Sequence, residues 1–241
     1  MSPPELSVII PCYNEQGTIG EILRRVQHAC GEVAGDYECI VVDDGSTDET
    51  VRRARAAIVD HDRCCVIATE KNAGKTAAVN VGLAHALGRW VIIQDADLEY
   101  DPASFPKLLA EAKRRDVVAV YGKRPSHWQR PDRMILAGGV LLIDLVILGL
   151  HGRFVRDHAT CHKLVRRDVL ESLELESLAF DGCVEITCKL IRLGHTIAQV
   201  PIPYTPRSRL EGKKLTWRHG FGAVRRAWVC RGWRVDVAST G

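Results

Sequence analysis

The chain has 241 residues, 46% of them hydrophobic, so it can bury a substantial core as one large domain. Its formal net charge is only +3, from 33 basic and 30 acidic residues, which gives no reason to expect nucleic-acid binding. The nine cysteines have no repeated C-x-x-C spacing and lie mostly among apolar neighbours, as is typical of reduced core cysteines. The first residues lack the basic start and long apolar stretch of a secretion signal, so we expect a cytoplasmic protein.

Short segments rich in valine and isoleucine alternate along the chain with longer segments whose apolar residues recur at helical spacing. The expected strands are residues 6–10, 39–42, 65–68, 91–93 and 117–121. The expected helices are residues 18–30, 48–59, 76–87 and 102–114. This alternation predicts an α/β fold with a doubly wound, mostly parallel sheet.

The alternation ends after residue 121, and the longest apolar segment of the chain, residues 134–150, follows. This segment is shorter than the roughly 20 residues of a membrane-spanning helix and carries Asp144 near its middle, so we do not expect it to cross a bilayer. Because it is apolar on all sides, it fits a buried helix, a subunit contact or a helix lying in the membrane interface. A polar turn at residues 156–162 and a helix at 181–192 are expected further on.

Acidic and amide side chains follow three of the expected strands, at the carboxyl ends where α/β sheets bind their ligands. After the fourth strand, Asp95 and Asp97 are separated by one residue, so an extended backbone directs both carboxylates to the same side. Together they are expected to bind Mg²⁺ or Mn²⁺, which neutralises a diphosphate leaving group. The alternative, a simple helix start, explains the N-cap signal of Asp101 and Pro102 but leaves Asp95 and Asp97 without a role.

The other strand-end residues allow both a structural and a functional interpretation. Ser46 and Glu49 have the spacing of a capping box, while Asp44 is free at the same time to accept hydrogen bonds from a base or a ribose. Asn14 and Glu15 after the first strand are consistent with a simple turn. Lys75 follows a turn that opens a helix and is either a phosphate partner or a solvated charge, without the spacing of a P-loop.

Taken together, four segments resemble the family-2 glycosyltransferases of GT-A fold. They are VIIPCYNE at residues 8–15, VDDGSTD at 42–48, NAGK at 72–75 and DADL at 95–98. The resemblance implies that a nucleotide-diphosphate sugar is bordered by Pro11, Tyr13, Glu15, Val42 and Asp44. It also implies that Asp95 and Asp97 hold the metal and the diphosphate, and that Ala96 between them contacts the nucleotide sugar.

The later part of the chain resembles the branch that contains dolichyl-phosphate mannose synthases and bacterial polyprenyl-phosphate glycosyltransferases. The matching segments are GKR at 122–124, Asp157 with TCHK at 160–163, EITCK at 185–189, YTPR at 204–207 and EGKK at 211–214. By analogy, Arg124, Arg207 and Lys213 surround the diphosphate and the acceptor phosphate. Glu99 stands where many mannose synthases have glutamine and is a candidate third metal ligand. We expect a GT-A domain at residues 1–220 and a basic, aromatic C-terminal tail at 221–241, with a helical extension.

A phosphate acceptor fits because the second half has no Glu-Asp pair of the kind that serves as general base towards a sugar hydroxyl, although Asp181 and Glu185 are possible substitutes. A phosphate monoester is already mostly ionised at neutral pH and needs cations instead. Basic and aromatic residues are interleaved from 206 to 234, which suits an anionic membrane surface or a solvated helix.

The predicted activity is metal-dependent, inverting transfer of a hexose from GDP-mannose or a UDP-sugar to polyprenyl phosphate. The protein is expected to be cytoplasmic, to associate with the membrane surface without spanning it, and to be capable of forming a homo-oligomer. Alternatives are a transferase with a small soluble acceptor and a non-catalytic sugar-nucleotide-binding protein.

Overall fold

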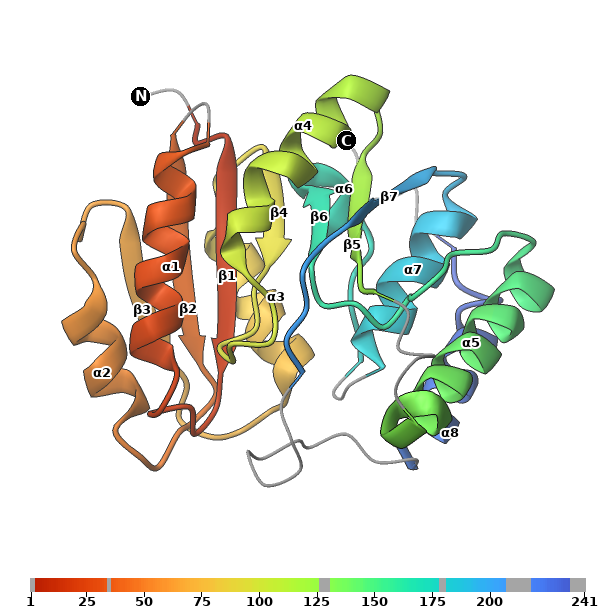
Figure 1. The fold of residues 1–241 in the computed structure, drawn as a ribbon, viewed down its shortest axis with the longest axis horizontal. Coiled ribbons are helices and arrows are strands. Elements are labelled where there is room, and N and C mark those ends of the chain that lie inside the picture. Colours follow the sequence, from red (N-terminus) through yellow and green to blue (C-terminus); the bar gives the residue numbers. More distant parts are fainter. Residues whose placement is uncertain (1–2, 34–35, 126–130, 178–180, 207–217, 235–241) are drawn as a thin grey trace.

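The computed structural model describes residues 3–33, 36–125, 131–177, 181–206 and 218–234. A seven-stranded sheet with the strand order β3-β2-β1-β4-β6-β5-β7 crosses the molecule (Figure 1). Its strands are β1 (Leu6–Cys12), β2 (Tyr37–Asp43), β3 (Cys64–Ala68), β4 (Trp90–Ile93), β5 (Ala119–Lys123), β6 (Lys163–Arg166) and β7 (Ile197–Pro201). β6 pairs antiparallel with both of its neighbours, β4 and β5, whereas the other pairs in the sheet are parallel. The carboxyl ends of the parallel strands therefore meet at one edge, together with the start of β6.

Helices cover both faces of this sheet (Figure 1). They are α1 (Ile19–Gly31), α2 (Thr50–Ala57), α3 (Lys75–His85), the 3-10 helix η1 (Pro102–Ser104), α4 (Phe105–Arg115), α5 (Pro131–His151), α6 (Arg167–Ser172), α7 (Gly182–Arg192) and α8 (Arg218–Val229). Alternate residues of a strand point to opposite faces, so Val8 packs in the core under α1 and α4, and Ile9 in the core under α3 and α7. The predicted α/β fold with a mostly parallel sheet is confirmed.

Gly82 brings α3 close against the sheet. A Cβ at this position would lie 2.5 Å from Cγ2 of Ile9 on β1, so the glycine is required for this helix-to-strand distance. We expect Gly82→Ala to lower the free energy of unfolding by about 1–3 kcal/mol, as overpacked cores do. Gly149→Ala, on an open part of α5 with no atom within 4 Å of the new Cβ, is expected to raise it by up to about 1 kcal/mol. Urea unfolding of both variants measures the difference, and equal effects would contradict the packing argument.

The structure corrects several predicted elements. The strand expected at 117–121 is β5, Ala119–Lys123, because Asp116 ends α4 in the left-handed conformation (φ 50°) and the Val117 amide still donates to the Ala112 carbonyl. The capping box is not formed, since α2 begins at Thr50 and Asp48 accepts the hydrogen bond from its amide. Asp101 does cap the next helix, as expected, by accepting a hydrogen bond from the Ala103 amide at 3.1 Å.

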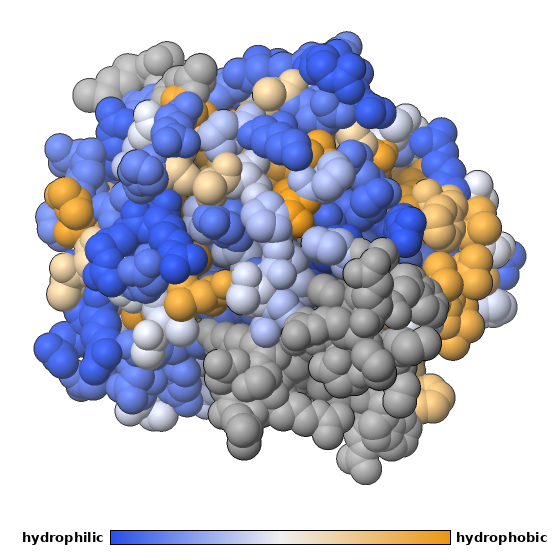
Figure 2. Space-filling view, in the orientation of Figure 1, coloured by the Kyte–Doolittle hydropathy of each residue, from blue (hydrophilic) through white to orange (hydrophobic). Residues whose placement is uncertain are grey.

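The apolar segment 134–150 lies within α5, and this helix is not buried on all sides. Ile147 and Asp144 point into the core, whereas Leu142 and Leu145 are 61% and 49% exposed. A fully buried helix is therefore excluded for this segment, and the subunit and membrane alternatives stay open. Apolar residues gather on the side of the molecule where α5 lies (Figure 2). Within the described ranges, no helix combines the length and the apolar character needed to cross a membrane.

The predicted boundary between residues 220 and 221 falls inside α8. Three residues of this helix region, Ala223, Ala227 and Cys230, are buried in the same core as α5 and α7. His151 at the end of α5 also donates a ring hydrogen bond to the Ala227 carbonyl at 3.0 Å. We therefore propose that α8 belongs to the single folded domain rather than to a separate tail.

Candidate active site

The loops after β1 and β2 are bound to one another at the carboxyl edge of the sheet. The Asn14 amide donates to Oγ of Ser46 at 2.8 Å, and the Asn14 side chain accepts from the Thr47 amide at 2.9 Å. Asn14 has a φ of 53°, a left-handed conformation that asparagine tolerates better than most residues. Polar side chains thus hold the two loops in one fixed arrangement.

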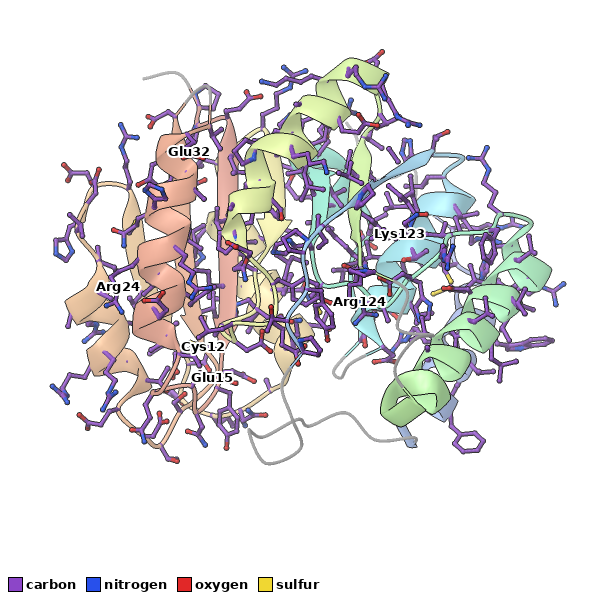
Figure 3. The ribbon with its side chains drawn as sticks, in the orientation of Figure 1. Cys12, Glu15, Arg24, Glu32, Lys123 and Arg124 are labelled. Atoms are coloured by element: carbon purple, nitrogen blue, oxygen red, sulfur yellow. The ribbon has the colours of Figure 1, made fainter. Side chains whose placement is uncertain are left out.

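The residues expected to border the nucleotide lie around these loops. Pro11 and Val42 are direct neighbours on β1 and β2, and both side chains are buried. Tyr13 and Glu15 follow β1 and are partly exposed (Figure 3 labels Glu15), with Glu15 accepting a hydrogen bond from Thr18 at 2.9 Å. Tyr13 and Glu15 are therefore accessible at this edge, whereas the side chain of Val42 packs beneath the loops.

Asp44 fixes the turn that opens α3. Its two carboxylate oxygens accept hydrogen bonds from the Ala73 and Gly74 amides, each at 2.8 Å. Gly74 has a φ of 99°, which only glycine adopts readily, and it leads directly into Lys75 at the start of α3. Asp44 therefore positions Lys75, while its expected contact with a base or ribose stays a prediction.

Lys75 and Asp95 form an ion pair at the centre of the edge, and Lys75 also donates to Sγ of Cys161 at 3.2 Å. Burial alone would raise the pKa of Asp95, but the Lys75 ammonium and hydrogen bonds from Cys161 and Lys75 bring it below the ordinary value. Asp95 is therefore an ionised carboxylate in a place that already stabilises a cation. Ala96 beside it is buried.

Asp97 and Glu99 follow on the same loop but have different partners. Oδ1 of Asp97 accepts a hydrogen bond from the Glu99 amide at 3.1 Å. Oε2 of Glu99 accepts one from the Tyr204 hydroxyl at 2.8 Å, and Tyr100 and Tyr204 form a β-bridge beside it. Among the described residues, no three His, Cys, Asp or Glu side chains converge on one point. The role of Glu99 as a third metal ligand therefore stays a prediction, and in this structure its carboxylate is bound to Tyr204.

Arg124 directly follows β5, at the same edge of the sheet (Figure 3). Its guanidinium forms a two-pronged ion pair with Asp157 and lies over the Tyr204 ring, 5.1 Å from the centroid. Asp157 is itself held by Asp144 of α5, which accepts hydrogen bonds from the Asp157 and His158 amides at 2.9 and 3.1 Å. The charge in the middle of the apolar helix therefore orients the loop that fixes Arg124.

Two of the expected phosphate partners, Arg207 and Lys213, lie outside the described residues. Their assignment stays a prediction. Arg226 is one of the basic residues of the segment 206–234 that were expected on a membrane surface or a solvated helix, but it forms an ion pair with Asp181 at 3.2 Å and is mostly buried. The interpretation of Arg226 as a surface cation is therefore wrong.

Several residues of this site carry no strong signal in the sequence. Gln94, which follows β4, and Tyr100 are buried within the site. In the sequence, little distinguishes them from ordinary core residues. Gln94 is a polar residue that directly ends an apolar strand, and this was the one available indication. Lys163 is also buried, with its ammonium donating to the His158 carbonyl at 2.7 Å, although lysine is normally a surface residue.

The loops described above lie within the part of the chain that matches a known protein family. The family model described as glycosyl transferase family 2 matches residues 7–173, which include all but the first residue of β1, the strands β2 to β6, and the loop that carries Asp95 and Asp97. The chain belongs to glycosyl transferase family 2. Its resemblance to the bacterial polyprenyl-phosphate branch is also confirmed by curated relatives.

Two of these relatives are undecaprenyl-phosphate 4-deoxy-4-formamido-L-arabinose transferases. The protein of Klebsiella pneumoniae is 30% identical over 175 residues, covering 71% of this chain and 52% of the relative. That of Pseudomonas paraeruginosa is 33% identical over 174 residues, covering 70% and 49%. This family-2 chain thus spans about half the length of the curated relatives it matches.

Solved structures show the same fold at low sequence identity. Glucosyl-3-phosphoglycerate synthase of Mycobacterium tuberculosis superimposes with a TM-score of 0.69 at 22% identity, covering 94% of this chain and 79% of the other. The same enzyme in complex with Mn²⁺, uridine-diphosphate-glucose and phosphoglyceric acid gives a TM-score of 0.71 at 21% identity, covering 97% and 82%. The family-2 chain therefore has the GT-A fold.

Proposed function

We propose that this chain transfers a sugar from a nucleotide-diphosphate donor to polyprenyl phosphate. The choice of a phosphate acceptor rests on the partners of the two carboxylates that are candidates for a general base. Glu185 is fully buried and pairs with Lys189 at 2.7 Å, and Asp181 pairs with Arg226 and Ser177. Both carboxylates are thus bound to cationic partners that hold them away from a proton-accepting role towards a hydroxyl.

An acceptor phosphate removes the need for such a base. Its second pKa is about 6, so it is mostly dianionic at neutral pH and attacks the sugar without losing a proton. Arg124 at the end of β5 offers a guanidinium already held in place by Asp157 and Tyr204, and such a fork matches the oxygens of a phosphate. The names of the curated relatives, which are transferases for undecaprenyl phosphate, support the same acceptor class.

The donor side of the proposal rests on Lys75, Asp95 and Asp97. Mg²⁺ and Mn²⁺ prefer oxygen ligands, and Mg²⁺ commonly uses one or two carboxylates with substrate phosphates and water. Asp95, whose carboxylate is ionised, and Asp97 lie on one loop and fit that set, so we assign these two residues to the metal, with Glu99 as a candidate third ligand. Bound there, the metal would neutralise the departing diphosphate. Lys75 opens α3, where its ammonium and the helix N-terminus both favour an anion.

The test is product analysis with purified chain, Mn²⁺, a nucleotide sugar and undecaprenyl phosphate. We expect a glycosyl phosphate with the anomeric configuration opposite to that of the donor, observed by NMR of the first-formed product, and loss of the reaction in EDTA. Screening UDP-sugars and GDP-mannose by thermal shift first identifies the donor, since a ligand at a hundred times its Kd stabilises by about 2.7 kcal/mol. Retention of configuration, transfer to a hydroxyl, or equal transfer to a small soluble phosphate such as 3-phosphoglycerate would overturn the proposal.

We further propose that an anionic membrane surface binds the α5/α8 face, defined by Leu142 and Leu145 of α5 and Phe221 and Trp228 of α8. Phe221 and Trp228 are 71% and 61% exposed, so large apolar side chains of both helices face solvent. The Arg231 guanidinium lies 5.2 Å from the Trp228 ring centroid, which places a cation beside an aromatic side chain suited to the interface.

Vesicle binding tests this face. We expect co-sedimentation with vesicles containing anionic lipid to decline as salt rises, because the screening length falls from about 10 Å at 0.1 M to about 3 Å at 1 M. The double variant Arg225→Gln and Arg231→Gln should weaken binding further, because each cation near the surface contributes about 1 kcal/mol. The matched change Arg52→Gln, on the exposed surface of α2, should leave it unchanged. Vesicle binding that depends neither on salt nor on Arg225 and Arg231 would contradict the proposal.

A further inference from the structure

The side chain of Gln94 binds both ends of the acidic loop, residues 95–100. Its side chain is fully buried at the end of β4. The amide Nε2 donates to the Asp95 carbonyl at 3.0 Å and to the Tyr100 carbonyl at 3.3 Å. These two carbonyls lie at the two ends of residues 95–100, the loop that carries the carboxylates assigned to the metal. One side chain thus holds both ends of that loop.

The hydrogen bonds of Gln94 determine the state of His162. Backbone carbonyls only accept, so the amide nitrogen must face Asp95 and Tyr100, and Oε1 must face His162. Nε2 of His162 lies 2.7 Å from Oε1 and therefore donates its proton. Burial lowers the pKa of His162 to about 4, which keeps the ring neutral near pH 7. Nδ1 has no hydrogen-bond partner in the part of the chain that the structure describes.

His162 is itself held by contacts with its neighbours. Its ring centroid lies 4.9 Å from that of Tyr100 and 5.7 Å from that of Phe105. Its carbonyl accepts a hydrogen bond from the Gly122 amide at 2.9 Å, which ties the start of β6 to β5. A Cβ on Gly122 would lie 3.1 Å from Cβ of His162, so glycine leaves room for this close approach.

We propose that His162 is a positioning residue that acts through Gln94 to hold the acidic loop in the geometry required for metal-dependent donor binding. The inference deepens the proposed function and rests on it, since it concerns the carboxylates assigned to the metal. Without the His162 donor, Oε1 of Gln94 is left buried and unpaired, while its Nε2 still faces the two carbonyls. A buried acceptor without a partner is unfavourable, so the loop separates from Gln94 more readily in the absence of the His162 donor.

The test compares nucleotide binding with and without metal. His162→Phe keeps an aromatic ring and removes the donor, whereas His162→Gln places an amide N–H at the same number of bonds from Cβ. We measure the Kd of the nucleoside diphosphate of the wild-type donor by calorimetry, once with Mn²⁺ and once with EDTA, below the unfolding temperature of each variant. In Mn²⁺ we expect His162→Phe to weaken binding about tenfold and His162→Gln to restore most of it. In EDTA the affinities should agree within about twofold.

A control separates positioning from general loss of packing. Phe105→Leu removes one of the two rings beside His162 but leaves the hydrogen bond to Gln94, so it should lower the unfolding temperature without a metal-specific loss of affinity. Wild-type metal dependence in His162→Phe, or an equal loss with Mn²⁺ and with EDTA, would overturn the inference alone. If the nucleotide affinity of the wild-type protein is the same with Mn²⁺ and with EDTA, the proposed metal-dependent function is wrong, and this inference is wrong with it.

Discussion

Asp97→Asn is expected to reduce sugar transfer by at least two to three orders of magnitude while the protein stays folded. The reason for a folded variant is local: Oδ1 of residue 97 accepts a hydrogen bond from the Glu99 amide, and asparagine offers the same oxygen. What the change removes is one negative charge from the pair that we assign to the metal. Metal stabilisation of a leaving group contributes several kcal/mol to a barrier, and each 1.36 kcal/mol is a factor of ten in rate.

The control for this variant is Asp101→Asn on the following turn. Asp101 caps η1 through the Ala103 amide, and asparagine caps a helix about as well as aspartate. Both variants lose one negative charge within a few residues of each other, but only Asp97 belongs to the proposed metal site. Steady-state turnover at saturating donor should therefore separate them, and a wild-type rate for Asp97→Asn would refute the assignment.

Lys189→Met is expected to lower the free energy of unfolding by about 3–5 kcal/mol, because it leaves a buried carboxylate without its main cation. The side chains of Lys189 and Glu185 are 2% and 0% exposed, and their charged atoms are 2.7 Å apart. Lys189 also donates to the Leu173 and Glu174 carbonyls at 2.8 and 2.9 Å, and these would lose a donor as well. Arg226 lies 3.8 Å from Glu185 and offsets only a part of the lost charge.

The matched comparison is Lys113→Met. Lys113 pairs with Glu5 at 2.7 Å, about the same distance, but its side chain is 51% exposed. Exposed pairs contribute about 0–1 kcal/mol, so the two Lys→Met changes should differ several-fold in urea unfolding. Equal losses would show that the buried pair does not have the role in stability that its burial indicates.

Much of the fold could be predicted because the first half of the chain has one simple pattern. The segments 6–10, 39–42, 65–68 and 91–93 are apolar on both faces, as strands covered by two helical layers must be, and each lies within an observed parallel strand. The acidic loop was predictable for the same reason, since it directly follows one of these strands. The fold class and the position of the candidate site were therefore accessible from sequence.

The second half was harder because its strands do not look like strands. β6 is Lys163–Arg166, a segment of four residues with a basic residue at each end, and one of them is a buried lysine held by carbonyls. β7 alternates only weakly and ends in proline. The partners of Glu99 and Arg226 are likewise determined by residues far along the chain, Tyr204 and Asp181, and no local pattern encodes such pairings.

Asp144 gives the inward side of α5 a role that the outward side does not share. Successive residues of an α-helix are about 100° apart, so any rotation of α5 about its axis would replace this carboxylate by an apolar neighbour and release the loop at Asp157 and His158. The outward Leu142 and Leu145 are thus free to vary without changing what the inward side holds. Replacing both by glutamate is then a route to a chain with altered surface behaviour and an unchanged Arg124 geometry. The proposed surface affinity and the geometry around Arg124 can in this sense be changed independently in one helix.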